Sequence, residues 1–289
     1  ADAVEGATVQ ISAGRLDLPR QGPHISEHNL WNANVPGSTV FAPVTDVAQQ
    51  MVAFLAVMVS NGYTLFDDRA GRVAGDLDDH FASGLIDPNR KLPLSFFEQY
   101  VLCSCATELS VINHNIALAA QGLGIGGWHF TGINPLSVMG AFAGQGVPGL
   151  GFRIETSPDW AVPNPVGLDG LFEAWCPPYL PDMRAAQQRL HEVKFGAGGT
   201  YDPATGGPFA DSPSVKQTAV PYSDAFNDAM GVMMQYVYAT YGKFPGTVPT
   251  LYMRTYYQAH LIDTDFYDRF FGPEVYFPQQ ARRSGDSGR

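Results

Sequence analysis

The stretch SFFEQYVLCSCATELSVINHNIALAAQGLGIGGWHFTG, residues 95–132, decides the fold. Ser95 and Glu98 have the spacing of a capping box, in which both side chains accept hydrogen bonds from free N–H groups at a helix start. Apolar residues then recur every three or four positions, which predicts one apolar helical face: Leu109, Ile112, Ile116, Ala119 and Leu123. Gly122 is expected to supply the left-handed residue that ends the helix. The sequence therefore predicts a long, nearly uncharged, buried helix followed by a glycine-rich turn.

Small residues dominate the second half of this helix. Ala117, Ala119 and Ala120 keep its late turns thin, so that a neighbouring helix or a flat ligand can approach closely. Gly124, together with the glycine pair at 126–127, forms the turn that follows. A turn of this composition predicts close packing at the end of the helix.

The segment NIALAAQGLG, residues 115–124, resembles the central helix of nitroreductase-like flavoproteins. In that family an N-x-x-L-A-A-x-x-L-G-L-G pattern leads into a strand and a loop beside the flavin. The resemblance implies an α+β fold, with an antiparallel or mixed sheet flanked by helices around a long central helix. It also implies a homodimer with FMN at the subunit interface. The implied chemistry is ping-pong: reduced nicotinamide, NADH or NADPH, delivers hydride to FMN, and an organic small molecule then accepts the electrons.

The same resemblance points to candidate flavin contacts around the turn. Thr131 and Gly132 stand where the family places the loop that contacts the flavin N5. Asn113 lies on the helix and is expected to reach towards the ligand. Asn29 belongs to a loop that is loosely similar to the family's Pro-Ser-x-x-Asn-x-Gln-Pro-Trp type loop, with different spacing. These four residues are the expected contacts to the ring and its edge.

Phosphate binding is the point at which this chain departs from the family. A flavin phosphate needs basic groups, and the family's early Arg-Arg-Ser-x-Arg type run is missing here. Arg15 and Arg20 are the early basic residues, and Arg282 and Arg283 form the basic pair near the other end. These four arginines are therefore the expected phosphate contacts.

Composition narrows the class of protein. The chain has 289 residues, of which 45% are hydrophobic and 16% charged, so it can bury a large core. Its net charge of −11 argues against a nucleic acid or an anionic membrane as partner, since both need clustered Lys and Arg. No segment approaches the ~20 apolar residues of a membrane-spanning helix. Three cysteines do not form a disulfide framework, and no signal peptide is expected at the start, so a cytoplasmic location is expected.

The rest of the chain predicts one domain, residues 1–289, with long loops and a C-terminal extension. The expected helices are 47–61, 135–142, 182–195, 225–241 and 264–271, and the expected strands are 7–12, 63–66 and 149–155. Thr45 and Asp46 are expected to cap the first of these helices, and Ser223 with Asp224 the helix that Gly242 ends. Residues 14–37 and 67–79 read as irregular or polar turn regions, and residues 196–213 as an exposed, mobile loop.

Two further classes of function stay open. His24 and His28 are four residues apart with Glu27 between them, so they are candidate metal ligands, with His114 or His260 as a third. A metal-dependent enzyme is therefore one alternative, and a non-catalytic, dimeric ligand-binding protein of the same fold is the other. A nucleophilic cysteine is disfavoured, because a cysteine inside an apolar helix is usually a small hydrophobe.

Overall fold

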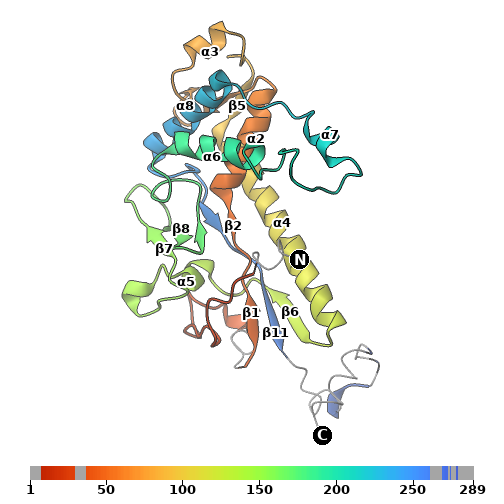
Figure 1. Ribbon diagram of the computed structural model, residues 1–289. Helices are drawn as coiled ribbons and strands as arrows, with labels where there is room; N and C mark the ends of the chain where they lie inside the picture. The colour runs from red at the N-terminus through yellow and green to blue at the C-terminus, as the bar shows by residue number, and fades with distance from the viewer. Residues whose placement is uncertain (1–7, 30–36, 261–268, 273, 275–277, 279–289) are drawn as a thin grey trace. The chain divides into compact units, whose positions relative to one another are not determined.

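The computed structural model describes residues 8–29, 37–260, 269–272, 274 and 278 (Figure 1). The chain divides into two compact units. Unit 1 draws on residues 1–45, 106–171 and 253–289, and unit 2 on residues 46–105 and 172–252. Each unit is thus built from segments that lie far apart in the sequence, where the sequence predicts one domain over residues 1–289.

Helices and strands alternate along the chain in an α+β arrangement. The helices are η1 (Glu27–Asn29), α2 (Val47–Ser60), α3 (Asp78–Ala82), α4 (Leu94–Gly122), α5 (Pro135–Met139), η2 (Ala143–Gln145), α6 (Met183–Phe195), α7 (Ser212–Lys216) and α8 (Asp224–Tyr241). The strands are β1 (Thr39–Phe41), β2 (Thr45–Asp46), β3 (Thr64–Asp67), β4 (Arg72–Val73), β5 (Lys91–Pro93), β6 (Gly126–Phe130), β7 (Arg153–Glu155), β8 (Asn164–Leu168), β9 (Phe172–Glu173), β10 (Leu251–Tyr252) and β11 (Tyr256–His260).

The strands of the described chain form several small sheets. Their orders are β1-β11-β6, β10-β2, β4-β3-β5 and β7-β8-β9. The pairing of β3 with β5 is parallel, while β1 with β11, β11 with β6, β3 with β4 and β7 with β8 are antiparallel. The sheets are therefore small and mostly antiparallel.

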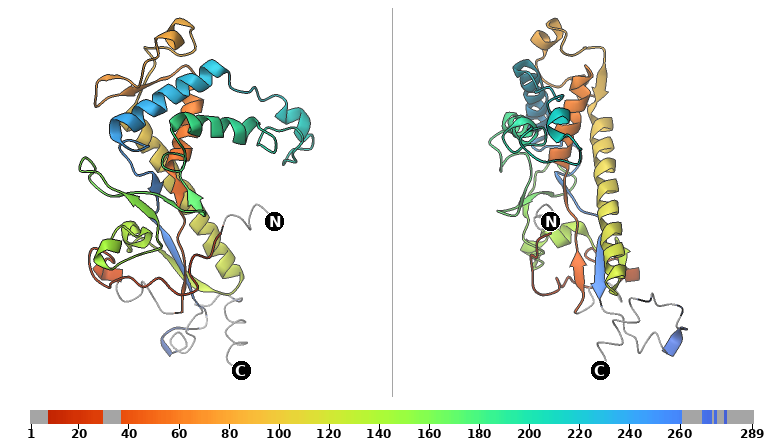
Figure 2. Two further views of the ribbon diagram at one scale, coloured as in Figure 1. Left: turned by 60° about the vertical axis from the view of Figure 1, so that its left-hand side comes forward. Right: turned by 45° about the vertical axis from the view of Figure 1, so that its right-hand side comes forward.

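In unit 1, α4 covers one face of the β1-β11-β6 sheet. Tyr257 and Ala259 project from β11 towards the thin part of the helix, where Ala117 and Ala120 pack against them. Figure 2 shows β6 and β11 beside the last turns of α4. The two alanines permit this contact because a larger side chain would hold the helix away from the sheet, as their spacing predicts.

The buried side of α4 differs from the one that the sequence predicts. Ile112 is 47% exposed and Leu123 is 63% exposed, so the expected apolar face is largely not the buried one. The buried stripe instead comprises Phe97, Val101, Cys105, Leu109, Asn113, Ala117 and Ala120. These residues also recur at spacings of three and four. Periodicity alone is therefore compatible with burial of either of two faces of α4. In unit 1, the face that packs against the sheet is the one with the smaller side chains, Ala117 and Ala120.

Both ends of α4 also differ from expectation. Glu98 does not form a capping box with Ser95: the Ser95 backbone N–H donates to Asp68 Oδ1 at 3.0 Å, and Glu98 accepts from the backbone N–H of Gly246 at 2.6 Å. At the other end, Gly124 rather than Gly122 takes the left-handed conformation, with φ 71°. The Gly124 N–H donates to Gln121 O, and the Ile125 N–H donates to Ala120 O. These two hydrogen bonds form a Schellman motif.

Unit 2 is organised by the packing of α2, α6 and α8 on one another. Two helix starts have caps that the sequence predicts, because the side chains of Asp46 and Ser223 each accept a backbone N–H in the first turn. Asp182 caps α6 in the same way, where the sequence predicts it as the first residue of the helix. Gly242, with φ 72°, ends α8 as predicted. Local cap residues therefore set these boundaries.

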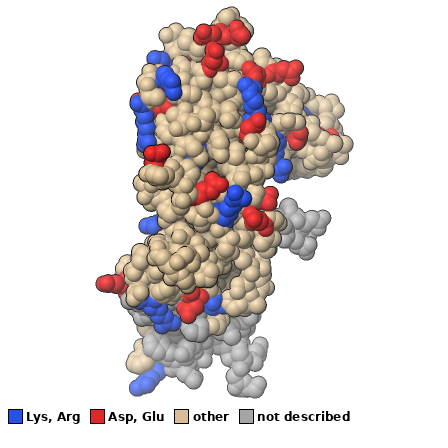
Figure 3. All heavy atoms as spheres, turned by 90° about the vertical axis from the view of Figure 1, so that its left-hand side faces the viewer, with Lys and Arg blue, Asp and Glu red and all other residues tan. Residues whose placement is uncertain are grey.

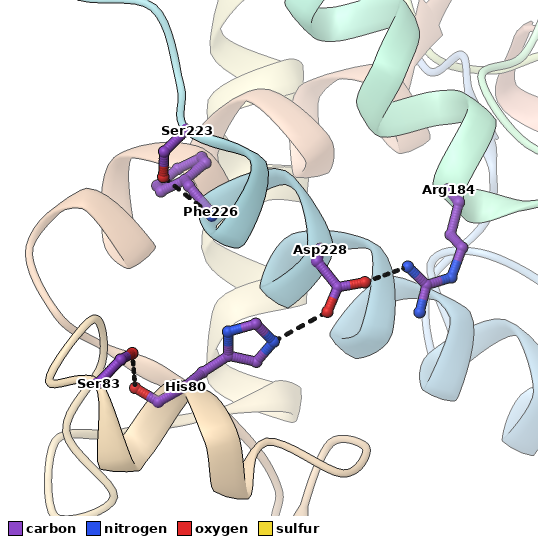
Figure 4. A network of polar contacts seen from close by, with 6 residues as sticks. All are labelled: His80, Ser83, Arg184, Ser223, Phe226 and Asp228. Carbon is purple, nitrogen blue, oxygen red and sulfur yellow. Dashed lines mark hydrogen bonds and ion pairs between the residues drawn. The ribbon is translucent and has the colours of Figure 1, made fainter.

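A polar network ties α3, α6 and α8 together within unit 2 (Figure 4). Asp228 of α8 lies between two partners: Arg184 Nη1 of α6 donates to its Oδ1 at 2.5 Å, and His80 Nε2 of α3 lies 3.0 Å from its Oδ2. This one carboxylate joins three helices that are widely separated in the sequence.

The segment expected to be mobile is organised by hydrogen bonds. Asp202 accepts the backbone N–H groups of Gly198 and Ala204 at 2.7 and 2.9 Å. The ammonium group of Lys216 donates to Thr205 O at 3.1 Å and to Gly206 O at 3.0 Å. A composition rich in glycine and proline thus indicates turns, and the hydrogen bonds from the buried Lys216 fix two carbonyl groups of these turns.

Other expected elements are partly present. Residues 8–12 form no strand, β7 is shorter and more exposed than the buried strand expected at 149–155, and α5 ends three residues earlier than expected. The expected helix at 264–271 lies mostly outside the described residues. Within the described ranges, no helix has the length and apolar character that a membrane crossing needs.

Charged side chains are unevenly distributed along the chain. On the face shown in Figure 3, Lys and Arg are interspersed with Asp and Glu. The segment from Leu109 to Phe152, in contrast, contains no Asp, Glu, Lys or Arg. This segment includes the second half of α4, β6 and α5, and it therefore presents an uncharged part of unit 1.

Candidate flavin groove

A groove of about 360 Å³ lies in unit 1 where α4 meets β6. The helix contributes one stripe at spacings of three and four, and the strand contributes two residues that alternate with buried ones. The lining residues are His114, Ala117, Leu118, Gln121, Ile125, Gly127, His129 and Tyr257. This volume is at the low end of the ~300–1,000 Å³ typical of ligand sites.

The floor of the groove depends on Gly127 of β6. The Tyr257 ring is 2% exposed and lies against this glycine. A Cβ at position 127 would collide with the Tyr257 hydroxyl and would lie 2.6 Å from the Gln258 carbonyl oxygen. Glycine is therefore required here for the close approach of β11, and together with Ala117 it leaves a floor without protruding side chains.

The polar side chains of the groove are two imidazoles, an amide and a phenol. His114 and Gln121 come from α4, and His129 comes from β6 with its ring centroid 5.0 Å from that of Tyr257. Desolvation, and then the proximity of His114, lower the pKa of His129. Burial raises the pKa of Tyr257. No carboxylate lines the groove in the described part of the chain, so both imidazoles line it without a counter-charge.

The expected basic residues lie elsewhere in unit 1. Arg15 donates to Gln258 Oε1 at 3.3 Å and to Ser38 Oγ at 3.3 Å. Gln258 and Tyr257 are successive residues of β11 and so project from opposite faces of the sheet, which places Arg15 on the face away from the groove. Burial lowers the pKa of Arg15 to about 10.

Arg20 lines a separate cavity. This cavity, of about 410 Å³, is formed by residues 17–20 with residues 146–148. Asp17 contributes a carboxylate to the same lining. Arg20 therefore does not share a site with the α4–β6 groove.

The expected ring contacts are not among the residues that line the groove. Asn113 is 1% exposed and donates from Nδ2 to Thr255 O at 3.0 Å, so it ties α4 to the chain before β11. Gly132 O accepts the Ser26 backbone N–H at 2.7 Å, and Thr131 beside it is exposed. Asn29 ends η1. Arg282 and Arg283 lie outside the described residues.

The metal alternative finds little support in the geometry. His24 Nδ1 lies 2.9 Å from Ser137 Oγ, and its ring meets Phe142 edge to face at 5.1 Å. His28 is exposed on η1. Among the described residues, no group of three or more His, Cys, Asp or Glu converges as a metal site would require. His24 is thus held by a serine and an aromatic ring.

Two residue spacings in the sequence indicate the faces that line the groove, and none of the motifs described above includes them. His114 and Gln121 are seven residues apart, two helical turns, and Gly127 and His129 are two apart on a strand. Each pair must share a face of its element. Only the packing of α4 on β6 brings the two faces together.

Comparisons with protein-family models, with curated proteins and with solved structures found no match.

Proposed function

We propose that this chain is an FMN-dependent oxidoreductase that reduces an organic small molecule with electrons from reduced nicotinamide. The observation that carries the proposal is the groove that α4 and β6 line, with Ala117 and Gly127 at its floor. A flat ring system needs a floor without protruding side chains, and Ala117 and Gly127 provide one. When bound, FMN supplies hydride acceptance and donation at N5.

The chain's own residues would bind and orient the ring. Leu118 and Ile125 offer apolar contact, and the buried ring of Tyr257 closes the floor. Gln121 can donate and accept at the polar edge of a flavin through one side chain. The residues present therefore fit the ring, and no described residue of the groove acts as a fixed cation.

A second copy of the chain is proposed to cover the open side of the groove. Val111, Ile112 and Leu118 of α4, and Leu123 directly after it, are between 47% and 63% exposed. Asn115 and Ala119 lie between them on the exposed side of the helix. This face belongs to the uncharged segment, so two copies of a protein with net charge −11 can meet there without like-charge repulsion. The homodimer would exclude water from the ring.

The test is an absorbance spectrum of freshly purified protein, followed by mass analysis of any small molecule released on denaturation. The expected result is a yellow protein that releases FMN, or a colourless protein that becomes yellow and binds stoichiometrically after incubation with FMN. Anaerobic addition of NADH or NADPH should then bleach the flavin bands. A protein that stays colourless after incubation with FMN would overturn the proposal.

A further inference from the structure

Two imidazoles line the α4–β6 groove in a segment without Asp, Glu, Lys or Arg. His114 and His129 are the only histidines of the uncharged segment from Leu109 to Phe152, and both line the groove. No described residue forms a hydrogen bond with either side chain. Their donors and acceptors are thus available to a ligand.

The surroundings of this imidazole pair contain no opposing charge. On α4 the groove-lining neighbours are alanine, leucine and glutamine, on β6 glycine, and on β11 the titratable Tyr257. The pKa of His129 is lowered by desolvation and by His114, which means that each proton added to one imidazole disfavours protonation of the other. An anion placed between them would remove that conflict.

We propose that His114 and His129 form the phosphate-binding end of this groove, taking the role that arginines play in most phosphate sites. The inference rests on the proposed function, because it names the groups that hold the ligand's anionic end. A phosphate accepts hydrogen bonds from imidazolium donors, and the groove offers these from the two histidines, while Gln121 lies two helical turns from His114 and is left for the ring.

A histidine site loses affinity for phosphate as the pH rises, whereas an arginine site stays charged and binds the dianion, which forms above pH ~6, at least as well. A neutral imidazole donates one hydrogen bond and carries no charge, while imidazolium donates from both nitrogens. A bound phosphate would favour the imidazolium form, so the protein would take up protons as the ligand binds near pH 7. Riboflavin has the same ring without the phosphate and should cause no such uptake.

The experiment compares FMN with riboflavin by titration calorimetry at pH 6 and pH 8, each in two buffers of different ionisation enthalpy. We expect FMN to bind about tenfold more tightly than riboflavin at pH 6, with this preference largely lost at pH 8. FMN binding at pH 7 should be accompanied by net proton uptake. The double variant His114→Gln with His129→Gln should lose both effects and keep its affinity for riboflavin, which also shows that it is folded.

The matched control is His28→Gln, which removes an exposed imidazole of unit 1 outside the groove and should leave both effects intact. Equal affinities for FMN and riboflavin at both pH values, without proton uptake, would overturn this inference and leave the flavin function standing. Retention of the FMN preference in the double variant would also overturn it. Failure of both ligands to bind would reject the flavin function itself.

Discussion

The buried carboxylate of Glu98 accepts a hydrogen bond of 2.7 Å from the backbone N–H of Thr247. Its second oxygen accepts the Gly246 backbone N–H, so one helical side chain satisfies a turn that lies far away in the sequence. Burial raises the pKa of Glu98, and the two N–H donors and nearby Lys243 oppose that shift. Within unit 2 this residue is therefore a structural anchor for the turn after α8.

We expect Glu98→Ala to lower the free energy of unfolding by about 3 kcal/mol, because it leaves backbone donors buried without acceptors. Urea denaturation at pH 7 measures the loss. Glu108→Gln, at an exposed position of the same helix, should change stability by less than about 1 kcal/mol. An equal effect of the two substitutions would contradict the role given to Glu98.

The Asp228 network makes stability depend on acid pH. The hydrogen bond from Arg184, with a smaller contribution from His80, holds the pKa of Asp228 below its ordinary value. A carboxylate whose pKa is lower in the folded protein stabilises above its unfolded pKa of ~3.9, and this contribution is lost as pH falls below it. Asp228→Asn should therefore cost about 0.5–1 kcal/mol at pH 7, since the group is half exposed and screened.

The difference between wild type and Asp228→Asn should shrink as the pH falls below ~3.9, and also at high salt, in urea titrations across this range. Asp76→Asn, an exposed acid of the same unit, should show no comparable pH-dependent difference. A difference that persists unchanged at pH 3 would mean that packing rather than charge explains the substitution.

Lys216 is expected to control the conformation of the loop at residues 198–206. Its side chain is 8% exposed, and its ammonium group donates to two loop carbonyl oxygens. Lys216→Met should cost about 1–3 kcal/mol and increase proteolytic cleavage within the loop, because those acceptors lose their donor. Lys91→Met removes an exposed lysine over the Phe66 ring and should leave the cleavage rate unchanged.

Filling the groove should prevent flavin binding without unfolding the protein. Gln121 is exposed at the rim, so Gln121→Trp places an indole in the groove while leaving the floor intact. FMN affinity, followed by flavin fluorescence, should fall by about tenfold or more, with little change in melting temperature. Val162→Trp, at an exposed site of unit 1 outside the groove, is the control. Unchanged affinity in Gln121→Trp would place the flavin elsewhere.

Charges on the exposed face of α4 should separate the proposed homodimer. Ile112→Lys combined with Leu123→Lys brings like charges onto both copies where apolar contact is expected. Size-exclusion chromatography with light scattering should give twice the monomer mass for wild type and the monomer mass for the double variant. A monomeric wild type at micromolar concentration would reject the dimer, and Val162→Lys should behave like wild type.

The sequence predicted those features that depend on neighbouring residues. The starts of α2 and α8 and the end of α8 follow from Asp46, Ser223 and Gly242, because a cap is made within one turn of chain. The long helix α4 and the turn after it were predicted for the same reason. The specific flavoprotein resemblance stays a prediction.

Tertiary packing decided what local patterns left open. Two stripes of α4 had helical periodicity, and contact with Tyr257 and Ala259 selected the one that passes through Ala117 and Ala120. Glu98 had the spacing of a cap, yet it accepts from Gly246, a partner that no local pattern could identify. His114 and His129 share a groove only because α4 packs on β6. The sequence alone determines helix propensity and helix caps, because these depend on interactions within a few residues. Which faces of the helices and strands pack together depends on residues far apart in the chain, through steric fit and the hydrogen bonding of buried polar groups.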